Sequence, residues 1–136
     1  MKNLNLVEGI SAIVFETEGV CVVNTTPHNI TMMDTSGEVV DVPTSVLVNA
    51  KAVEEQVSPL FVETRFVGTE EGAETIAMIE EAFANTGRKE TLVIVGSIIA
   101  AQAYRGKIVA MTPCPGYERV APTEKRMNCN KFTIFS

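Results

Sequence analysis

Residues 112–126 hold the side chains of this sequence that are best suited to bind a ligand. The segment contains Tyr117, Arg119, Lys125 and Arg126, together with three prolines and one glycine. Arginine forms paired hydrogen bonds to phosphate oxygens, lysine adds a compact positive charge, and a tyrosine ring can stack on a purine. Because each proline fixes a backbone angle, ordering the segment around a ligand costs less. The combination suits an adenine-containing pyrophosphate compound.

The same composition also fits a structural loop that binds nothing. In that interpretation, Arg119 and Arg126 pair with the neighbouring acids Glu118 and Glu124. The prolines then only stiffen a connection between two elements. Residue types alone slightly favour the structural loop, so both interpretations stay open at this point.

Two shorter segments are weaker candidates for chemistry. Gly96-Ser97 follows an apolar strand and precedes a predicted helix, a position whose backbone N–H groups can contact a phosphate. Simple chain turning is the more ordinary explanation of a glycine there. His28 is the only histidine and lies between a proline and an asparagine, which favours a local turn over an active site.

No enzyme signature accompanies these residues. One histidine cannot build a multi-histidine metal site, and the sequence lacks the P-loop, the nucleophile elbow and the dinucleotide-binding glycine motif. The acidic pairs at 70–71 and 80–81 lie on a predicted helix, where acids are ordinary. We therefore expect no catalytic residue, no metal and no cofactor.

Composition indicates an acidic globular protein. Its 136 residues carry a net charge of −6, with 46% hydrophobic residues, so we expect a single domain over 1–136 and no binding to polymeric nucleic acid. The three cysteines lack metal-site or disulfide spacing and are expected to be free thiols. Residues 1–8 lack the apolar run of a signal peptide, and the stretch 92–101 is too short to cross a bilayer. We expect a cytoplasmic protein that binds no membrane.

The hydrophobic pattern predicts an α+β fold, in which an N-terminal antiparallel β-meander precedes a smaller strand-helix-strand-helix-strand half. Asp34–Gly37 predicts a hairpin turn. Thr69 is expected to cap the first helix and Gly87 to end it. Residues 51–57 alternate too weakly to assign. The predicted strands cover 11–15, 20–24, 29–33, 38–42, 45–48, 60–67, 91–95 and 107–111, and the second helix covers 98–104.

The C-terminal stretch resembles a family of small phage proteins, the anti-Thoeris sponges. The resemblance rests on residues 115–127, Pro-Gly-Tyr-Glu-Arg-Val-Ala-Pro-Thr-Glu-Lys-Arg-Met, and on Lys-Phe-Thr-Ile-Phe at 131–135. The turn at 24–30, Asn-Thr-Thr-Pro-His-Asn-Ile, fits the same family. Residues 1–18 fall outside the resemblance.

The resemblance implies a function and a cellular setting. Sponges of this family are not enzymes: they bind and sequester cyclic ADP-ribose isomers (glycocyclic ADP-ribose) made by a bacterial TIR-domain enzyme, so the Thoeris effector is never activated. Their sites lie between protomers of a homo-oligomer, either a dimer or a hexamer built from dimers. Some members also hold cyclic di- or trinucleotides in a separate site. The protein would then be phage-encoded and act in the host cytoplasm.

The resemblance also suggests roles for individual residues. Arg119 and Arg126 would contact the phosphates, and Tyr104 or Tyr117 would stack on the adenine. The full set of ligand-binding candidates is Tyr104, Arg105, Thr112, Tyr117, Arg119, Lys125 and Arg126. Two alternatives remain: an enzyme that hydrolyses the same class of ligand with His28 or a carboxylate, and an interaction module that binds no small molecule.

Overall fold

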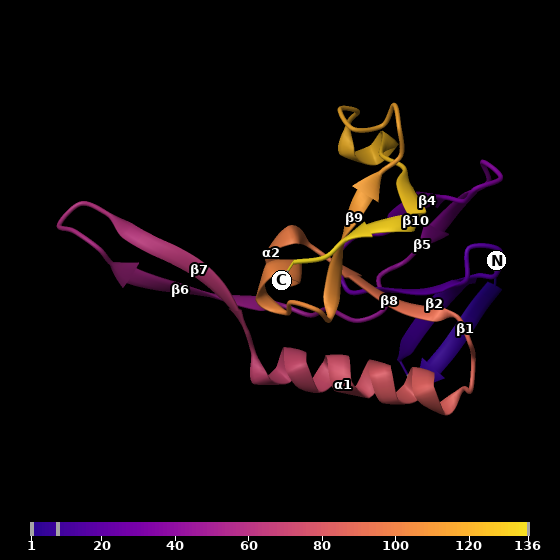
Figure 1. The fold of residues 1–136 in the computed structure, drawn as a ribbon, viewed down its shortest axis with the longest axis horizontal. Helices are drawn as coiled ribbons and strands as arrows, with labels where there is room; N and C mark the ends of the chain where they lie inside the picture. The colour runs from indigo at the N-terminus through magenta and orange to yellow at the C-terminus, as the bar shows by residue number, and fades with distance from the viewer. Residues whose placement is uncertain (1, 8, 136) are drawn as a thin grey trace.

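The computed structural model describes residues 2–7 and 9–135 (Figure 1). Met1 and Glu8, from the segment considered above for a signal peptide, lie outside the described residues, as does Ser136. In chain order the elements are β1 (Lys2–Val7), β2 (Ile10–Phe15), β3 (Val20–Asn24), β4 (Ile30–Met33), β5 (Val39–Val42), β6 (Ala50–Gln56), β7 (Val62–Gly68), α1 (Glu70–Asn85), β8 (Thr91–Gly96), α2 (Ile98–Ala103), β9 (Ile108–Pro113), a 3-10 helix η1 (Pro122–Glu124) and β10 (Met127–Thr133).

Most of these strands belong to one mixed sheet. Its strand order is β1-β2-β3-β8-β9-β10-β4-β5, while β6 and β7 pair with each other in a separate two-stranded sheet. Strands β1 to β3 form an antiparallel meander, and β3, β8 and β9 run parallel. Strand β10 runs antiparallel to β9 and parallel to β4. The expected α+β class is therefore confirmed, although the two expected halves share a single sheet.

Four segments differ from the sequence-based expectation. Residues 45–48 are not a strand: Ser45 N donates to the carbonyl of Asn24 and Val48 N to that of Thr25, two separate hydrogen bonds in place of a continuous ladder. The unassigned segment 51–57 forms most of β6, which alternates weakly because it is exposed on both faces. Strands β1 and β10 were not expected, since their pairing depends on segments distant in the sequence.

Hydrophobic side chains pack against both faces of the large sheet. On one face, α1 contributes Ile76 and Ile79 to a cluster that also contains α2 and Ile108 of β9. On the other face, Phe15 of β2 belongs to the same buried cluster as Met32 of β4. The β4–β5 edge therefore folds back over β2 and β3, and burial of these apolar faces is the main stabilising term of the fold.

The helix ends follow the expected capping chemistry. The Thr69 hydroxyl accepts a hydrogen bond from Gly72 N at 2.9 Å, and Gly87 follows the C-cap with a φ of 68°. The second helix begins after Ser97, whose hydroxyl accepts from Ala100 N at 3.1 Å. These caps satisfy N–H groups that a helix start leaves without partners. They confirm Thr69 and Gly87 in the roles predicted for them.

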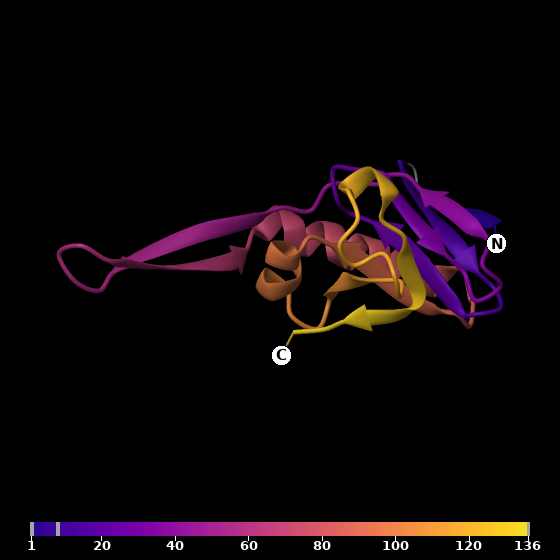
Figure 2. The ribbon, with the colours of Figure 1, turned by 90° about the horizontal axis from the view of Figure 1, so that it is seen from above.

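Strands β6 and β7 form an arm that extends away from the rest of the molecule in both views (Figures 1 and 2). Their pairing runs from Ala50 opposite Gly68 to Gln56 opposite Val62. At the tip, Leu60 is 86% exposed. None of the helices in the described part of the chain is long and apolar enough to span a membrane.

Candidate functional site

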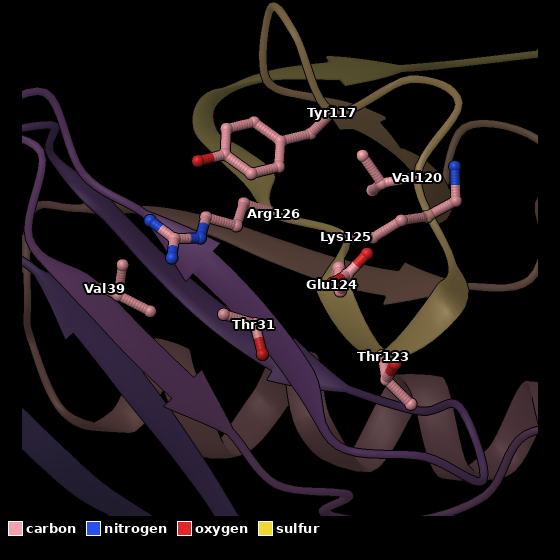
Figure 3. A pocket seen from close by; sticks show the side chains of 8 residues that line it. All are labelled: Thr31, Val39, Tyr117, Val120, Thr123, Glu124, Lys125 and Arg126. Atoms are coloured by element: carbon pink, nitrogen blue, oxygen red, sulfur yellow. The ribbon is translucent and has the colours of Figure 1, made fainter.

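A cavity of about 470 Å³ lies between the β9–β10 loop and the β4–β5 hairpin (Figure 3). Its residues are Thr31 and Val39 of the hairpin, and Tyr117, Val120, Thr123, Glu124, Lys125 and Arg126 of the loop. We call it the loop cavity. Its volume falls within the range of small-molecule sites. It gathers three of the predicted binding residues, namely Tyr117, Lys125 and Arg126.

Backbone hydrogen bonds fix the shape of the loop. Cys114 N donates to Arg126 O at 2.8 Å and closes the base of the loop. Tyr117 N donates to Cys114 O at 2.9 Å, which makes a tight turn in which Gly116 has a φ of 91°. Glycine favours this left-handed conformation because glycine has no Cβ atom. The loop is therefore held in one shape before any ligand is bound.

Arg126 and Tyr117 lie against each other in the wall of the cavity. The guanidinium carbon of Arg126 lies 5.1 Å from the centre of the Tyr117 ring, a cation–π distance. Figure 3 shows the guanidinium beneath the ring, with the Tyr117 hydroxyl pointing to the same side. Arg126 covers one face of the ring, so a base could stack only on the other. The two side chains together offer an anion five guanidinium N–H donors and one phenol donor.

Lys125 extends to the other side of the cavity. Its Nζ donates to the Glu118 carbonyl at 2.9 Å, and Figure 3 shows it pointing away from the Arg126 guanidinium. The Glu118 carboxylate accepts instead from Gly116 N at 2.6 Å. Two cations and the single carboxylate of Glu124 line the cavity, which gives it a net charge of +1.

The structural-loop interpretation predicted ion pairs of Arg119 and Arg126 with Glu118 and Glu124, and the described residues do not form them. Among the described residues, no carboxylate oxygen lies within 4.0 Å of the charged nitrogens of Arg119, Lys125 or Arg126. Glu118 is occupied by a backbone N–H, and Glu124 lines the cavity without contacting a cation at that distance. The loop therefore keeps its shape through backbone hydrogen bonds and the side-chain bonds of Glu118 and Lys125, and no carboxylate of the described residues neutralises its cations.

Three other candidates lie away from the loop cavity. Arg119 is exposed and lies outside the cavity lining. Thr112 is in β9, where its hydroxyl is 3.5 Å from that of Thr133. Arg105 follows α2, and its Nε donates to the Gln102 carbonyl at 3.1 Å. The structure does not bring these three side chains together with Tyr117 and Arg126.

Tyr104 has a structural role in this fold. The residue is only 8% exposed, and its hydroxyl donates to Asn49 O at 2.7 Å and accepts from Thr69 N at 2.8 Å. The ring also packs closely over the backbones of Gly68 and Gly72. It thereby ties the base of the arm to both helices. A ring enclosed in this way has little surface on which a base can stack.

A second cavity, of about 590 Å³, adjoins the first. We call it the turn cavity; it is lined by residues 26–31, Ser97, Met111, Pro122, Thr123, Lys125 and Met127. Thr31, Thr123 and Lys125 line both cavities. The sequence singled out His28 and Ser97 separately as weak candidates, but only the sheet topology shows that they line one space.

The remaining reactive groups are shielded. All three cysteines are free and buried. Burial raises the pKa of Cys21 and of Cys129 to about 11, and it raises the pKa of Cys114 against the opposing charge of Arg126. The thiols are therefore protonated and poor nucleophiles at neutral pH. Within residues 2–7 and 9–135, no three histidine, cysteine or acidic side chains cluster closely enough to hold a metal ion.

Comparison of the chain with protein-family models, with curated proteins and with solved structures finds no match. The geometry itself defines what the site offers. A stiff loop presents one guanidinium, one phenol and one ammonium around a cavity of about 470 Å³ with a single acid in its wall. These groups suit a small anion with several oxygen acceptors, such as a phosphate ester.

Proposed function

We propose that this protein binds a small nucleotide with two phosphates, of the cyclic ADP-ribose type, and sequesters it without breaking it. The observation that carries the proposal is the Arg126–Tyr117 pair, a cation stacked on an aromatic ring with no carboxylate neutralising it among the described residues. A guanidinium in this state binds a phosphate without first breaking an internal ion pair. The resemblance of residues 115–127 to anti-Thoeris sponges supports the same ligand class.

Sequestration acts through mass action. A signal in the nanomolar to micromolar range is withdrawn by a protein that binds it with about 8–12 kcal/mol of free energy. Hydrogen bonds to charged groups contribute about 1.5–3 kcal/mol each. Contacts from Arg126 and Lys125, with the buried surface of the nucleoside, can reach that total. Because the loop is already ordered, little of the binding energy is lost in fixing its shape.

The loop cavity offers little for hydrolysis of the ligand. Among its described lining residues there is no histidine or cysteine, and the one carboxylate, Glu124, is exposed. Among the described residues, no side chain hydrogen-bonds this carboxylate and orients it for general acid–base work. The hydrolase alternative would have to use His28, which lines the neighbouring turn cavity.

Calorimetric titration with glycocyclic ADP-ribose tests the proposal. Arg126→Gln should weaken binding by about tenfold or more, because a charge-assisted contact is lost. Arg119→Gln is the matched control: it removes the same charge from the same loop but lies outside the cavity lining. Equal losses in both variants would mean that general loop charge, and not this cavity, attracts the ligand.

Recovery of the ligand separates sequestration from catalysis. The protein is incubated with glycocyclic ADP-ribose and then denatured by heat, and the supernatant is analysed by chromatography. Intact ligand is expected, because binding alone leaves its bonds unchanged. Linearised product that disappears in a His28→Ala variant would instead establish the hydrolase.

We further propose that the protein works as a homo-oligomer in which a second protomer covers the solvent side of the loop cavity. The exposed apolar side chains at the arm tip, Leu60 and Phe61, are 86% and 66% exposed and are suited to such a contact. Light scattering should report a mass above that of one chain. A monomer that binds the ligand at full strength would contradict the proposal.

A further inference from the structure

The turn cavity lies at a branch point of the sheet. Strands β3 and β8 are parallel neighbours whose carboxyl ends meet where Asn24 pairs with Val95. After β3 the chain passes to β4, which packs in one buried cluster; after β8 it passes to α2, which packs in the cluster on the opposite face. Such diverging connections open a crevice beyond the strand ends, where open sheets with parallel strands commonly bind ligands. Residues of both connections line the turn cavity.

The turn that carries His28 is held rigidly by a buried side chain. Asn24 is fully buried, and its Nδ2 donates to His28 O at 2.8 Å and to Val42 O at 3.0 Å. Its Oδ1 accepts from Thr26 N at 2.8 Å. All the polar atoms of this amide are therefore bonded to the turn and to β5. A wall fixed in advance in this way lowers the entropy lost when a ligand binds.

A second tie joins this turn to the Ser97 side of the cavity. The hydroxyl of Thr25 donates to Val95 O at 2.7 Å, and Thr25 N donates to the same carbonyl at 3.0 Å. Val95 precedes Ser97 by two residues, so the two walls are held together by direct hydrogen bonds. Ser97 uses its oxygen to accept from Ala100 N, which leaves the hydroxyl proton able to reach a ligand.

The lining chemistry suits a flat heteroaromatic ring. Met111, Met127 and Pro122 supply apolar surface, and methionine sulfur packs well against aromatic rings. Histidine, serine and threonine side chains add hydrogen-bonding groups, and the described lining contains no carboxylate. Among the described residues, only main-chain atoms of His28 take part in hydrogen bonds, so both ring nitrogens can contact a ligand.

We propose that the turn cavity binds the nucleobase and its ribose, while the phosphates of the same ligand lie in the loop cavity. The inference rests on the proposed function for the position of the phosphates. Lys125 lines both cavities and can contact the first phosphate next to the ribose. The base then packs against methionines and the proline, and not on Tyr117, one face of which Arg126 already covers.

The single histidine makes this testable by NMR. His28 is the only histidine in the chain. Its ring C–H signals are therefore assigned directly as those present in wild type and absent in His28→Ala. Wild-type protein is titrated with ADP-ribose, with adenosine and with ribose 5-phosphate, which lacks the base. ADP-ribose and adenosine should shift the His28 signals strongly, and ribose 5-phosphate, which brings no base to the turn cavity, should shift them far less. In parallel calorimetry, His28→Ala should weaken adenosine binding about 2- to 10-fold, the range for one hydrogen bond.

The outcomes separate this inference from the proposed function. If ADP-ribose binds with dependence on Arg126 while the His28 signals stay fixed, the turn cavity does not hold the base, although the phosphate site stands. If adenosine shifts His28 but Arg126→Gln leaves ADP-ribose affinity unchanged, the base site stands and the proposed phosphate site fails. Absence of binding by all three probes overturns both.

Discussion

Replacing Asn24 with alanine should destabilise the protein more than any other single change in the β3–β4 turn. The Asn24 side chain is fully buried and makes four hydrogen bonds, two from Nδ2 and two to Oδ1. Alanine removes them all and adds no group that can replace them. The carbonyl of His28 keeps a hydrogen bond, because the Thr26 hydroxyl lies 2.9 Å away and can donate to it in the absence of Asn24. The carbonyl of Val42 and the N–H of Thr26 lose the side chain as a partner.

The expected loss follows from these two groups. A buried polar group left without a partner costs about 1–3 kcal/mol, so Asn24→Ala should lower the free energy of unfolding by about 3–4 kcal/mol. For a chain of 136 residues, this corresponds to a fall in Tm of about 10 °C. The change is large against a typical domain stability of about 5–15 kcal/mol.

Thermal and urea unfolding followed by circular dichroism measure this loss. Asn130→Ala is the matched control, because Asn130 lies exposed in β10 and its change should stay within about 0.5 kcal/mol. Asn24→Ala should also reduce adenosine binding, since His28 loses its anchored carbonyl. A destabilisation below about 1 kcal/mol would show that water or backbone movement satisfies these groups, and the rigidity argued for the turn would be refuted.

Three further changes have defined outcomes. Gly72→Ala should lower the Tm by several degrees, because the added methyl group collides with the Tyr104 hydroxyl; Tyr104→Phe in the same chain should recover part of the loss. The free energy of unfolding should fall between pH 8.5 and 11. The unfolded chain releases the Cys21 and Cys129 protons near pH 8.5, whereas burial raises the pKa of both thiols in the folded protein to about 11. Urea titrations at a series of pH values should show that the free energy of unfolding falls by up to about 1.4 kcal/mol per pH unit for each thiol. Cys21→Ala should reduce this slope, and a free energy of unfolding that does not change with pH would contradict the assignment to buried thiols. Glu124→Gln should strengthen ADP-ribose binding a few-fold in calorimetry, because a carboxylate leaves the wall of the loop cavity.

Local sequence signals predicted most elements but not their arrangement. Capping at Thr69, the turn at 34–37 and the apolar strand at 91–95 depend on neighbouring residues, and the structure has all three. Strand β10 has no such local signal, because its mixed composition becomes a strand only between β9 and β4. The exposed arm strand β6 lacks a buried face, so its alternation is weak.

The site was partly predictable for the same reason. Tyr117, Lys125 and Arg126 are close in sequence, and a stiff loop keeps them close in space. Tyr104 was a plausible stacking residue by type, but burial decides its role, and burial depends on the packing of Gly68 against α2. The hydrophobic pattern of a single sequence cannot predict this close packing of Tyr104 on a distant glycine.

The position of the binding residues depends on the strand that follows them. Arg126 directly precedes β10, whose first residue, Met127, pairs with Pro113 of β9 on one side and with Met32 of β4 on the other. The main chain of Arg126 is therefore anchored beside two strands, one of which carries Thr31 in the wall of both cavities. The main chain at Arg126 can therefore move only with β10, which its backbone pairing and the buried Cys129 side chain hold in the sheet. A main chain anchored in this way lets the proposed site bind a ligand with little adjustment of the backbone.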